Sequence, residues 1–372
     1  MYCLKFDASR IFITLSSKSC IEKAYKWANE NIVNNFDCTI VVIETDNNIQ
    51  GVGEVCNLGS SYLPAYSKGV RSGILEIGKN LIGKDPTNIN TINIEMDKSL
   101  YGHPYVKSPI DMACWDIIGK YYKAPIWQLF GGKYGETISL YRAISQEDPV
   151  QMKESVKHYK SEGYKKFQLK VGGYYQDDIE RIKQVDSILN DSNILVADAN
   201  TGWKTHEALK VIDKTCHLNI YYEQPCETYN ECLLIREKNN QPFILDESIF
   251  SLNSFLTAYK DNAMDIINLK ISKLGGLTKS KQIRDLCVEL NIPMTIEDSW
   301  GGDIATAAIS HLAHSTPVDY RFSSTDFNSY NAINYSEGSP QRINGQLKAS
   351  DSNGLGVELD FTKLGEPKFI IS

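Results

Sequence analysis

The feature that most constrains the fold is a repeated alternation of short apolar segments with longer amphipathic segments, from about residue 138 to residue 329. The apolar segments have the length and composition of buried strands, and the intervening segments have helical periodicity. The expected strands are Ile138–Arg142, Lys166–Val171, Ile194–Asp198, Ile220–Glu223, Phe243–Asp246, Ile266–Lys270, Met294–Glu297 and Tyr320–Ser323. Eight strands, each but the last followed by a helix, predict an α/β fold with an eight-stranded parallel barrel.

The helices of this region include Asp177–Leu189, His206–Thr215 and Lys279–Leu290. Periodicity alone does not distinguish a closed barrel from a doubly wound open sheet, which is the alternative fold. No Gly-x-Gly-x-x-Gly motif follows the first strand, and this absence weakens the dinucleotide-binding version of that alternative.

The N-terminal part has a different, α+β pattern. Strands at 38–45 and 49–55 flank the turn residues Asp46, Asn47 and Asn48 and predict a hairpin. Helices are expected at Ala65–Ile82 and Ser108–Tyr122, the second with Ser108 as N-cap and Pro109 at its first position. We therefore expect a first domain at 1–128, a barrel domain at 129–329, and a segment at 330–372 that lacks clear helix and returns to the first domain.

Composition excludes several classes of protein. The 372 residues include 39 Lys and Arg against 46 Asp and Glu, a net charge of −7, so nucleic acid is not an expected partner. No apolar run has membrane-spanning length, and the N-terminus lacks the pattern of a signal peptide. Nine scattered cysteines suit reduced thiols better than a disulfide framework. We expect a cytoplasmic protein with no membrane partner.

Ionisable residues close five consecutive strands of the predicted barrel. They are Lys170, Asp198, Glu223, Asp246 and Lys270, and each follows the previous one by 23 to 28 residues. This interval is one strand–helix unit, so all five side chains are expected at the C-terminal mouth of the barrel, where catalytic groups of this fold lie.

Three carboxylates at one mouth repel one another unless a cation lies among them. Oxygen ligands select a hard ion, and Mg²⁺ is favoured because it keeps positions open for water and substrate. Asp198, Glu223 and Asp246 are therefore the expected metal ligands, and Asn200 is expected to hydrogen-bond to a ligand. The alternative for each carboxylate is a helix cap.

The two lysines lie four strand steps apart, so they are expected on opposite sides of the metal. A neighbouring cation and burial lower the pKa of an amine, which lets a lysine act as a base. Lys170 and Lys270 are thus the candidate catalytic residues for removing a proton α to a carboxylate. Lys273 is expected to support the site. The alternative is that both lysines are surface residues.

The strand-end motifs resemble the muconate-lactonizing branch of the enolase superfamily. They are Lys170, Asp198-x-Asn200, Glu223-Gln-Pro, Asp246-Glu247-Ser and Asn268-Leu-Lys-Ile-Ser-Lys-Leu-Gly-Gly276, with the segments 102–116 and 129–132 in addition. The resemblance implies an α+β capping domain over a modified (β/α)₇β TIM barrel, with Mg²⁺ as cofactor and Glu247 close to the ligands. One departure is Gln168, where many relatives carry a lysine; its loss is expected to make Lys170 harder to deprotonate.

Loop segments 59–66, 140–146, 296–303 and 324–330 are similar to those of cis-3-hydroxy-L-proline dehydratases and hydroxyproline-betaine 2-epimerases. This similarity implies dehydration of cis-3-hydroxy-L-proline to Δ¹-pyrroline-2-carboxylate. Asp298 and Asp326 are expected to meet the substrate ammonium, and Tyr62 is expected to line the pocket. Trp300 keeps a quaternary betaine open as a substrate.

Several alternatives remain at this point. The same lysine pair suits a racemase or 2-epimerase of proline derivatives, or a dipeptide epimerase. The six histidines miss the strand ends, which argues against a sugar-acid dehydratase that uses a His–Asp pair. A barrel that only binds a ligand would not exchange an α-proton. By analogy with other barrels we expect a homo-oligomer with a small amino-acid substrate.

Overall fold

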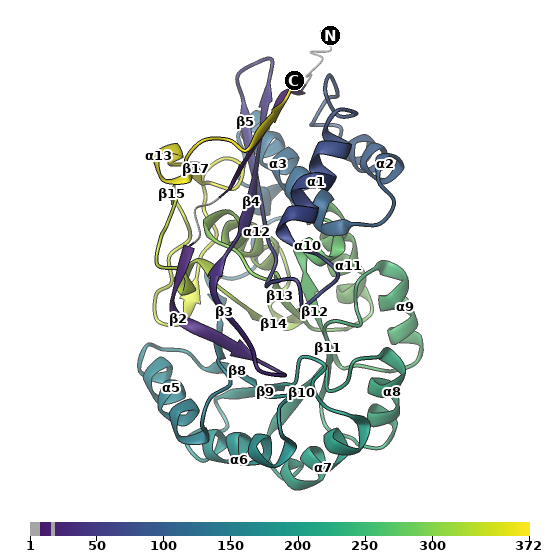
Figure 1. Ribbon diagram of the computed structural model, residues 1–372, viewed down its shortest axis with the longest axis vertical. Coiled ribbons are helices and arrows are strands. Elements are labelled where there is room, and N and C mark those ends of the chain that lie inside the picture. Colours follow the sequence, from purple (N-terminus) through teal and green to yellow (C-terminus); the bar gives the residue numbers. More distant parts are fainter. Residues whose placement is uncertain (1–7, 16–18) are drawn as a thin grey trace.

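The computed structural model describes residues 8–15 and 19–372. Its largest sheet has eight parallel strands, β7 to β14, which are neighbours in the order in which they follow one another along the chain (Figure 1). They are β7 (Tyr141–Ile144), β8 (Lys166–Lys170), β9 (Ile194–Asp198), β10 (Ile220–Glu223), β11 (Phe243–Leu245), β12 (Ile266–Lys270), β13 (Met294–Glu297) and β14 (Arg321–Ser324). A doubly wound sheet reverses its strand order at a switch point, so the consecutive order excludes that alternative.

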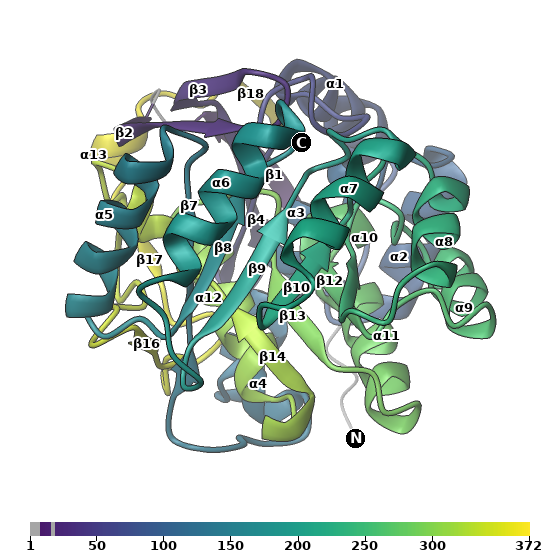
Figure 2. The same cartoon turned by 90° about the horizontal axis from the view of Figure 1, so that it is seen from below.

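Helices connect consecutive strands and lie outside the sheet (Figure 2). They are α5 (Pro149–Ser161), α6 (Tyr175–Asp186), α7 (Thr205–Thr215), α8 (Tyr229–Glu237), α9 (Leu252–Lys260), α10 (Ile271–Leu274), α11 (Leu277–Glu289) and α12 (Asp303–His314). Only a 3₁₀ turn, η2 (Phe327–Tyr330), follows β14 in place of an α-helix. The predicted (β/α)₇β barrel is confirmed.

The predicted first barrel strand, Ile138–Arg142, is wrong. Its first two residues form β6 (Ile138–Ser139), which pairs antiparallel with β16 (Gln346–Leu347), and the barrel strand β7 begins only at Tyr141. The apolar run is continuous in sequence, but its two halves pair with different partners. One partner lies near the C-terminal end of the chain, so local composition could not reveal the break.

The N-terminal part forms an antiparallel sheet in the order β18-β1-β4-β5, with a separate β2–β3 pair and helices packed beside it. The elements are β1 (Ala8–Leu15), β2 (Ser19–Trp27), β3 (Asn31–Phe36), β4 (Cys38–Thr45), β5 (Gln50–Cys56), α1 (Ser67–Gly78), α2 (Ile89–Ser99), α3 (Pro104–Tyr122) and α4 (Ile126–Leu129). The predicted hairpin is β4–β5. The C-terminal segment contains β15 (Ser336–Glu337), β17 (Glu358–Leu359), α13 (Phe361–Leu364) and β18 (Phe369–Ile371), and β18 pairs with β1.

Helix α3 begins at Pro104, four residues before the predicted start at Ser108. Pro104 takes the first helical position, where proline is tolerated, and Pro109 lies inside the helix. The Ser108 hydroxyl has no hydrogen-bond partner, so Ser108 does not cap the helix. The prediction from Ser108-Pro109 is wrong, because the helix begins one turn earlier, at the proline of His103-Pro104.

Glycines on β5 allow α3 to lie directly against this strand. A Cβ atom at Gly51 would lie 2.2 Å from the Ala113 carbonyl oxygen, and one at Gly53 would lie 1.9 Å from the Pro109 carbonyl oxygen. Real Cβ atoms do not approach backbone oxygens so closely, so no other residue type fits at either position without displacing the helix.

Two buried carboxylates join this capping part to the barrel. Glu54 on β5 accepts hydrogen bonds from the backbone amides of Gly302 and Ala305, at the N-terminus of α12. Asp111 on α3 accepts bonds from the amide (3.0 Å) and the hydroxyl (2.6 Å) of Thr278, in the first turn of α11. Both carboxylates satisfy helix-terminal donors and complement the helix dipole.

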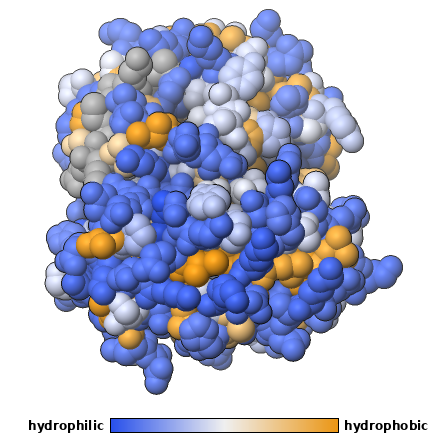
Figure 3. Space-filling view, turned by 60° about the horizontal axis from the view of Figure 1, so that its bottom comes forward, coloured by the Kyte–Doolittle hydropathy of each residue, from blue (hydrophilic) through white to orange (hydrophobic). Residues whose placement is uncertain are grey.

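The surface seen in Figure 3 is mainly hydrophilic, with apolar side chains in small patches. The main core cluster joins the barrel strands to the capping sheet and includes Leu269 and Ile296 as well as Ile40 and Val52. Of the helices in the described part of the chain, none has both the length and the apolar character needed to span a membrane.

Replacement of Asp111 by alanine is expected to lower the free energy of unfolding by about 3 kcal/mol, because it leaves the buried Thr278 amide without an acceptor. Urea unfolding followed by circular dichroism measures the change. Asp213→Ala, which removes an exposed carboxylate on α7, is the control and should change stability by less than about 0.5 kcal/mol. Equal stability of the two variants would contradict this role of Asp111.

A buried histidine ties α12 to α4 and to the C-terminal segment. His311 Nδ1 accepts a hydrogen bond from the Trp127 amide (3.2 Å), and Nε2 faces the Leu355 carbonyl oxygen (3.0 Å). These contacts require the neutral ring, with its proton on Nε2. Burial lowers the pKa of His311 from 6.5 to about 4.

Because the unfolded chain binds this proton more tightly than the folded chain, stability should fall as the pH drops from about 6.5 to about 4. The full contribution of His311 is about 3 kcal/mol. His311→Gln, which cannot titrate, should flatten this slope in urea titrations, whereas His206→Gln at an exposed position should not. An unchanged slope in His311→Gln would remove this residue as the cause.

Candidate active site

The five predicted strand-end residues lie at one level of the barrel. Lys170 is the register partner of Asp198, and Asp198 is the partner of Glu223. Asp246 follows the last residue of β11, and Lys270 ends β12. All five are buried, the lysines at 6% exposure. Consecutive parallel strands end at the same mouth of a barrel, so a spacing of one strand–helix unit brings them together.

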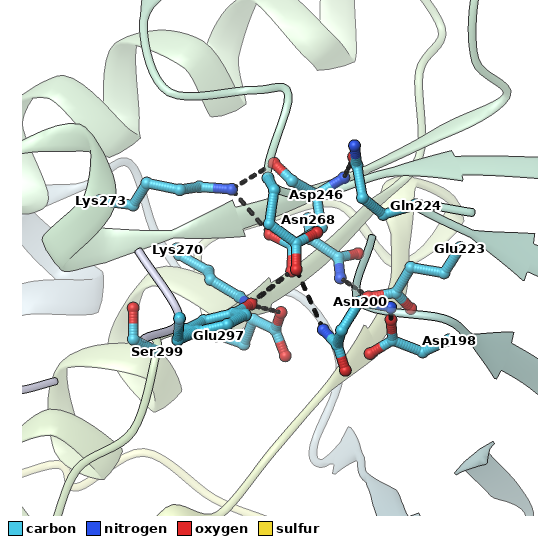
Figure 4. A network of polar contacts seen from close by, with 12 residues as sticks. Asp198, Asn200, Glu223, Gln224, Asp246, Asn268, Lys270, Lys273, Glu297 and Ser299 are labelled. Atoms are coloured by element: carbon cyan, nitrogen blue, oxygen red, sulfur yellow. Dashed lines mark hydrogen bonds and ion pairs between the residues drawn. The ribbon is translucent and has the colours of Figure 1, made fainter. Parts of the chain in front are cut away.

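Lysines and carboxylates form two adjacent buried groups at this mouth. Lys170 forms an ion pair with Asp198. Lys270 Nζ lies 2.5 Å from Asp246 Oδ2, and Lys273 Nζ lies 2.7 Å from Asp246 Oδ1. Figure 4 shows Lys270 and Lys273 approaching Asp246. Each of the two candidate catalytic amines therefore has its own carboxylate.

The capping part adds a tyrosine to each group. The Tyr62 hydroxyl, from the loop between β5 and α1, donates to Asp246 Oδ2 (3.0 Å) and accepts a hydrogen bond from Lys270. Tyr25 on β2 is buried against Lys170, whose ammonium interacts with its hydroxyl. Sequence alone suggested Tyr62 but not Tyr25, because nothing in the β2 segment marks the side chain that reaches the barrel.

Amide side chains donate hydrogen bonds to Glu223, the third of the predicted metal ligands. Gln168 Nε2 donates to both oxygens of Glu223 (3.2 and 3.0 Å), and Asn268 Nδ2 donates to Glu223 Oε1 (2.6 Å). Gln168 and Asn268 stand two residues before Lys170 and Lys270, on the same faces of β8 and β12. The predicted departure at Gln168 thus places a neutral donor beside Glu223 instead of a cation.

The other predicted supporting residues also lie around this cluster. The Asn200 backbone amide donates to Asp198 Oδ1 (2.8 Å), and its side chain donates to Glu247 Oε1 (3.1 Å). Burial and the charge of Asp246 raise the pKa of Glu247 to about 7. Glu247 Oε2 and the side-chain oxygen of Asn200, Oδ1, are buried without a hydrogen-bond partner in the structure.

Sequence reasoning missed Glu297, at the end of β13. Its Oε1 lies 3.6 Å from Lys270 Nζ, and its Oε2 accepts a hydrogen bond from Tyr141. Glu297 follows Lys270 at the same interval that separates the other strand ends. The signal was therefore present, but a role was assigned to the neighbouring Asp298 instead of Glu297.

Three residues predicted to meet the substrate make their described contacts elsewhere. Asp298 accepts hydrogen bonds from the amide and hydroxyl of Ser272 and from the Ser299 amide. The Trp300 ring stacks on Phe36, with centroids 4.3 Å apart, and also packs against Phe327 and Tyr25. Asp326 faces Tyr164 and Arg342. Among the described residues, no hydrogen bond joins these three to the lysines or to the three acids at the mouth, and their contact with substrate stays a prediction.

The electrostatics of the mouth depend on which charges lie nearest. Burial, followed by the charges of Asp198 and Asp246, raises the pKa of Glu223 well above its usual value. Burial also opposes ionisation of Asp246, but Lys270 and Lys273 outweigh it and lower the pKa of this carboxyl. For Lys170 and Lys270, burial is outweighed by the neighbouring carboxylates, so that the pKa of each amine is raised.

The donor set fits a hard cation in its chemistry. The three carboxylates are buried close together, and the charges of Asp198 and Asp246 disfavour ionisation of Glu223. A divalent cation among them would remove this repulsion. Lysines contact Asp198 and Asp246 directly. As placed, the described residues contain no set of three acidic, His or Cys side chains that encloses a metal position.

Comparison with known proteins identifies the family. Residues 28–131 match the N-terminal domain model of mandelate racemase/muconate lactonizing enzymes, and residues 151–363 match the enolase C-terminal domain-like model. Together they cover more than half of the chain, which therefore belongs to the mandelate racemase/muconate lactonizing enzyme family of the enolase superfamily.

Two individual proteins are similar to this chain over most of its length. The chain is 54% identical over 346 residues to cis-3-hydroxy-L-proline dehydratase of Roseibium aggregatum, covering 93% of this chain and 94% of that protein. It is 31% identical to N-succinyl-L-Arg/Lys racemase of Bacillus cereus, over 75% of this chain and 77% of the racemase.

Solved structures agree with this assignment. A mandelate racemase/muconate lactonizing enzyme from Roseovarius nubinhibens has a TM-score of 0.95 at 36% identity, with 99% of each chain covered. An enolase superfamily member from the same organism, complexed with magnesium, has a TM-score of 0.93 at 33% identity, covering 98% of this chain and 99% of that one.

Proposed function

We propose that the chain is a hydro-lyase that dehydrates cis-3-hydroxy-L-proline to Δ¹-pyrroline-2-carboxylate. The observation that carries the proposal is the pair of buried lysines at the ends of β8 and β12, four strands apart in an eight-stranded barrel. The high identity to a dehydratase of this substrate supports the choice of reaction.

Asp198, Glu223 and Asp246 would hold Mg²⁺, as the magnesium complex of a structural relative supports. When bound, the ion supplies a positive charge that binds the substrate carboxylate, stabilises the negative charge formed at the α-carbon and lowers the pKa of neighbouring amines. Gln168 and Asn268 orient Glu223 in this set, and Asn200 orients Asp198.

The stereochemistry of the substrate matches lysines on opposite sides of the barrel. In cis-3-hydroxy-L-proline the hydroxyl lies on the same ring face as the carboxylate, and therefore on the face opposite the α-hydrogen. One lysine, as the free amine, removes the α-proton. The C–O bond at carbon 3 then breaks on the other face, where the opposite lysine, as an ammonium, protonates the leaving hydroxyl to give water. The resulting enamine tautomerises to the imine product.

A racemase or 2-epimerase of proline derivatives, such as a hydroxyproline betaine, or of a dipeptide is the second candidate. The same two lysines support it, because a proton removed on one face can be replaced from the other when no leaving group is present. The identity to a racemase, at a lower level than to the dehydratase, also supports it. The two candidates differ in the substrate bound and not in the catalytic residues.

Replacing Lys170 or Lys270 by alanine is expected to lower kcat for cis-3-hydroxy-L-proline by about 10³-fold or more, because each lysine transfers one of the two protons. Proton NMR in D₂O measures the loss of the α-signal and the appearance of the pyrroline. The variant that retains the base should still exchange the α-proton of L-proline. Lys281→Ala, at the surface of α11, is the control.

Full turnover in either lysine variant would remove that residue from the mechanism. A panel of prolines, trans-3-hydroxy-L-proline, betaines and dipeptides in the same assay separates the candidates. Dehydration that is confined to the cis isomer supports the lyase. α-Proton exchange of a betaine or dipeptide, with the substrate retained and no pyrroline formed from cis-3-hydroxy-L-proline, would replace it by the epimerase.

Removal of divalent ions with EDTA should abolish turnover, and Mg²⁺ at about 100 times its Kd should raise Tm by about 5 °C, because the ion binds only the folded state. Glu223→Gln should lose most of this shift, since it removes a charged ligand. Glu247→Gln, which changes an adjacent acid outside the proposed ligand set, should retain it. A shift that survives Glu223→Gln but not Glu247→Gln would require a different ligand set.

A further inference from the structure

A cavity lies where the capping part meets the outer helices of the barrel. It has a volume of about 910 Å³, and its walls come from the loop between β5 and α1, from the segment around α2 and the start of α3, and from α9 to α11. Helices α2, α9 and α11 lie along this side of the molecule in both ribbon views (Figures 1 and 2). We call it the seam cavity. Its lining includes Glu247 and Lys273 but neither Lys170 nor Lys270.

The walls of the seam cavity are largely apolar. Leu63, Leu252 and Ile283 line it, together with two aromatic residues that are unusually exposed. Tyr101 is 95% exposed and Phe250 is 61% exposed. Clustered large apolar side chains around a concave surface are typical of ligand sites, so the body of a ligand for this cavity is expected to be apolar.

Charge at the cavity favours an anion. Lys107 and Lys279 both bind the single carboxylate of Asp97, at 2.7 and 3.0 Å. The third lysine of the lining, Lys273, is paired with Asp246, which lies outside the lining. Lys107 and Lys279 therefore exceed the carboxylate that they share by one positive charge.

Two helices also begin at the cavity. The lining includes Pro104 and Tyr105, the first residues of α3, and Ser251 and Leu252, the N-cap and first residue of α9. The N-terminal end of a helix carries a partial positive charge that favours an anion. The two helix ends and the excess lysine charge thus act on the same small volume that the apolar residues enclose.

We propose that the seam cavity binds an amphiphilic carboxylate, a small molecule with one carboxylate and an aromatic or aliphatic body. The body contacts Phe250, Leu252 and Ile283, and the carboxylate faces Lys279 and the two helix ends. The cavity adjoins the lysine–carboxylate cluster, but neither Lys170 nor Lys270 lines it, and the proposal does not depend on the reaction that takes place there. Lys273, which lines the cavity and binds Asp246, connects the two sites.

Dansylglycine is a suitable probe, because it carries one carboxylate and its fluorescence rises in apolar surroundings. We expect saturable binding that 3-phenylpropionate displaces and that 3-phenylpropylamine and acetate do not. Leu252→Glu should weaken binding about tenfold or more, which corresponds to about 1.4 kcal/mol. Leu256→Glu is the matched control, because Leu252 and Leu256 lie on α9 at 42% and 43% exposure and only Leu252 lines the cavity.

A second matched pair tests the charge. Lys279→Gln should weaken binding about fivefold, and Lys281→Gln, which also removes an aspartate-paired lysine of α11, should not change it. Lys170→Ala should bind the probe normally. Absence of saturable binding, equal effects within either pair, or loss of binding in Lys170→Ala would overturn the proposal, the last because it would place the probe at the barrel mouth.

Discussion

The structure depends on balancing buried charge at the mouth of the barrel. Three carboxylates and two lysines end consecutive strands, and Lys273 and Glu297 stand beside them, all of them buried. A buried charge without a partner is costly, so each lysine is held by an acid and each acid by a lysine or an amide. A reaction at this mouth must replace these ion pairs without leaving any lysine or carboxylate unpaired. A bound cation and an anionic substrate would together meet this condition, the cation facing the carboxylates and the substrate facing the lysines.

The capping part contributes two tyrosine side chains to the buried charged groups at the mouth. Tyr25 and Tyr62 come from two different segments, and each reaches one lysine. Their placement requires the capping sheet to keep a fixed position over the barrel. The buried carboxylates Glu54 and Asp111 maintain it by capping barrel helices from the capping side. Elements far from the mouth in sequence thus determine which side chains close it.

The sequence was sufficient for features that repeat locally. Regular intervals between ionisable strand ends predicted the barrel level and the cluster from Lys170 to Lys270. Contacts between distant segments were not predictable in this way. The break between β6 and β7 depends on pairing with β16, and the approach of Tyr25 depends on how the β2–β3 pair lies over the mouth. Glu297 was overlooked because two acids are adjacent there, and only the register of β13 decides which one faces Lys270.

The glycines of β5 have a mechanical consequence. With the backbone of α3 directly against Gly51 and Gly53, close backbone packing resists sliding of the strand along the helix. The capping sheet and α3 are therefore expected to move as one rigid body. The 57–66 segment follows β5 directly and carries Tyr62, so a displacement of this segment would separate Tyr62 from Lys270 and Asp246 in one motion.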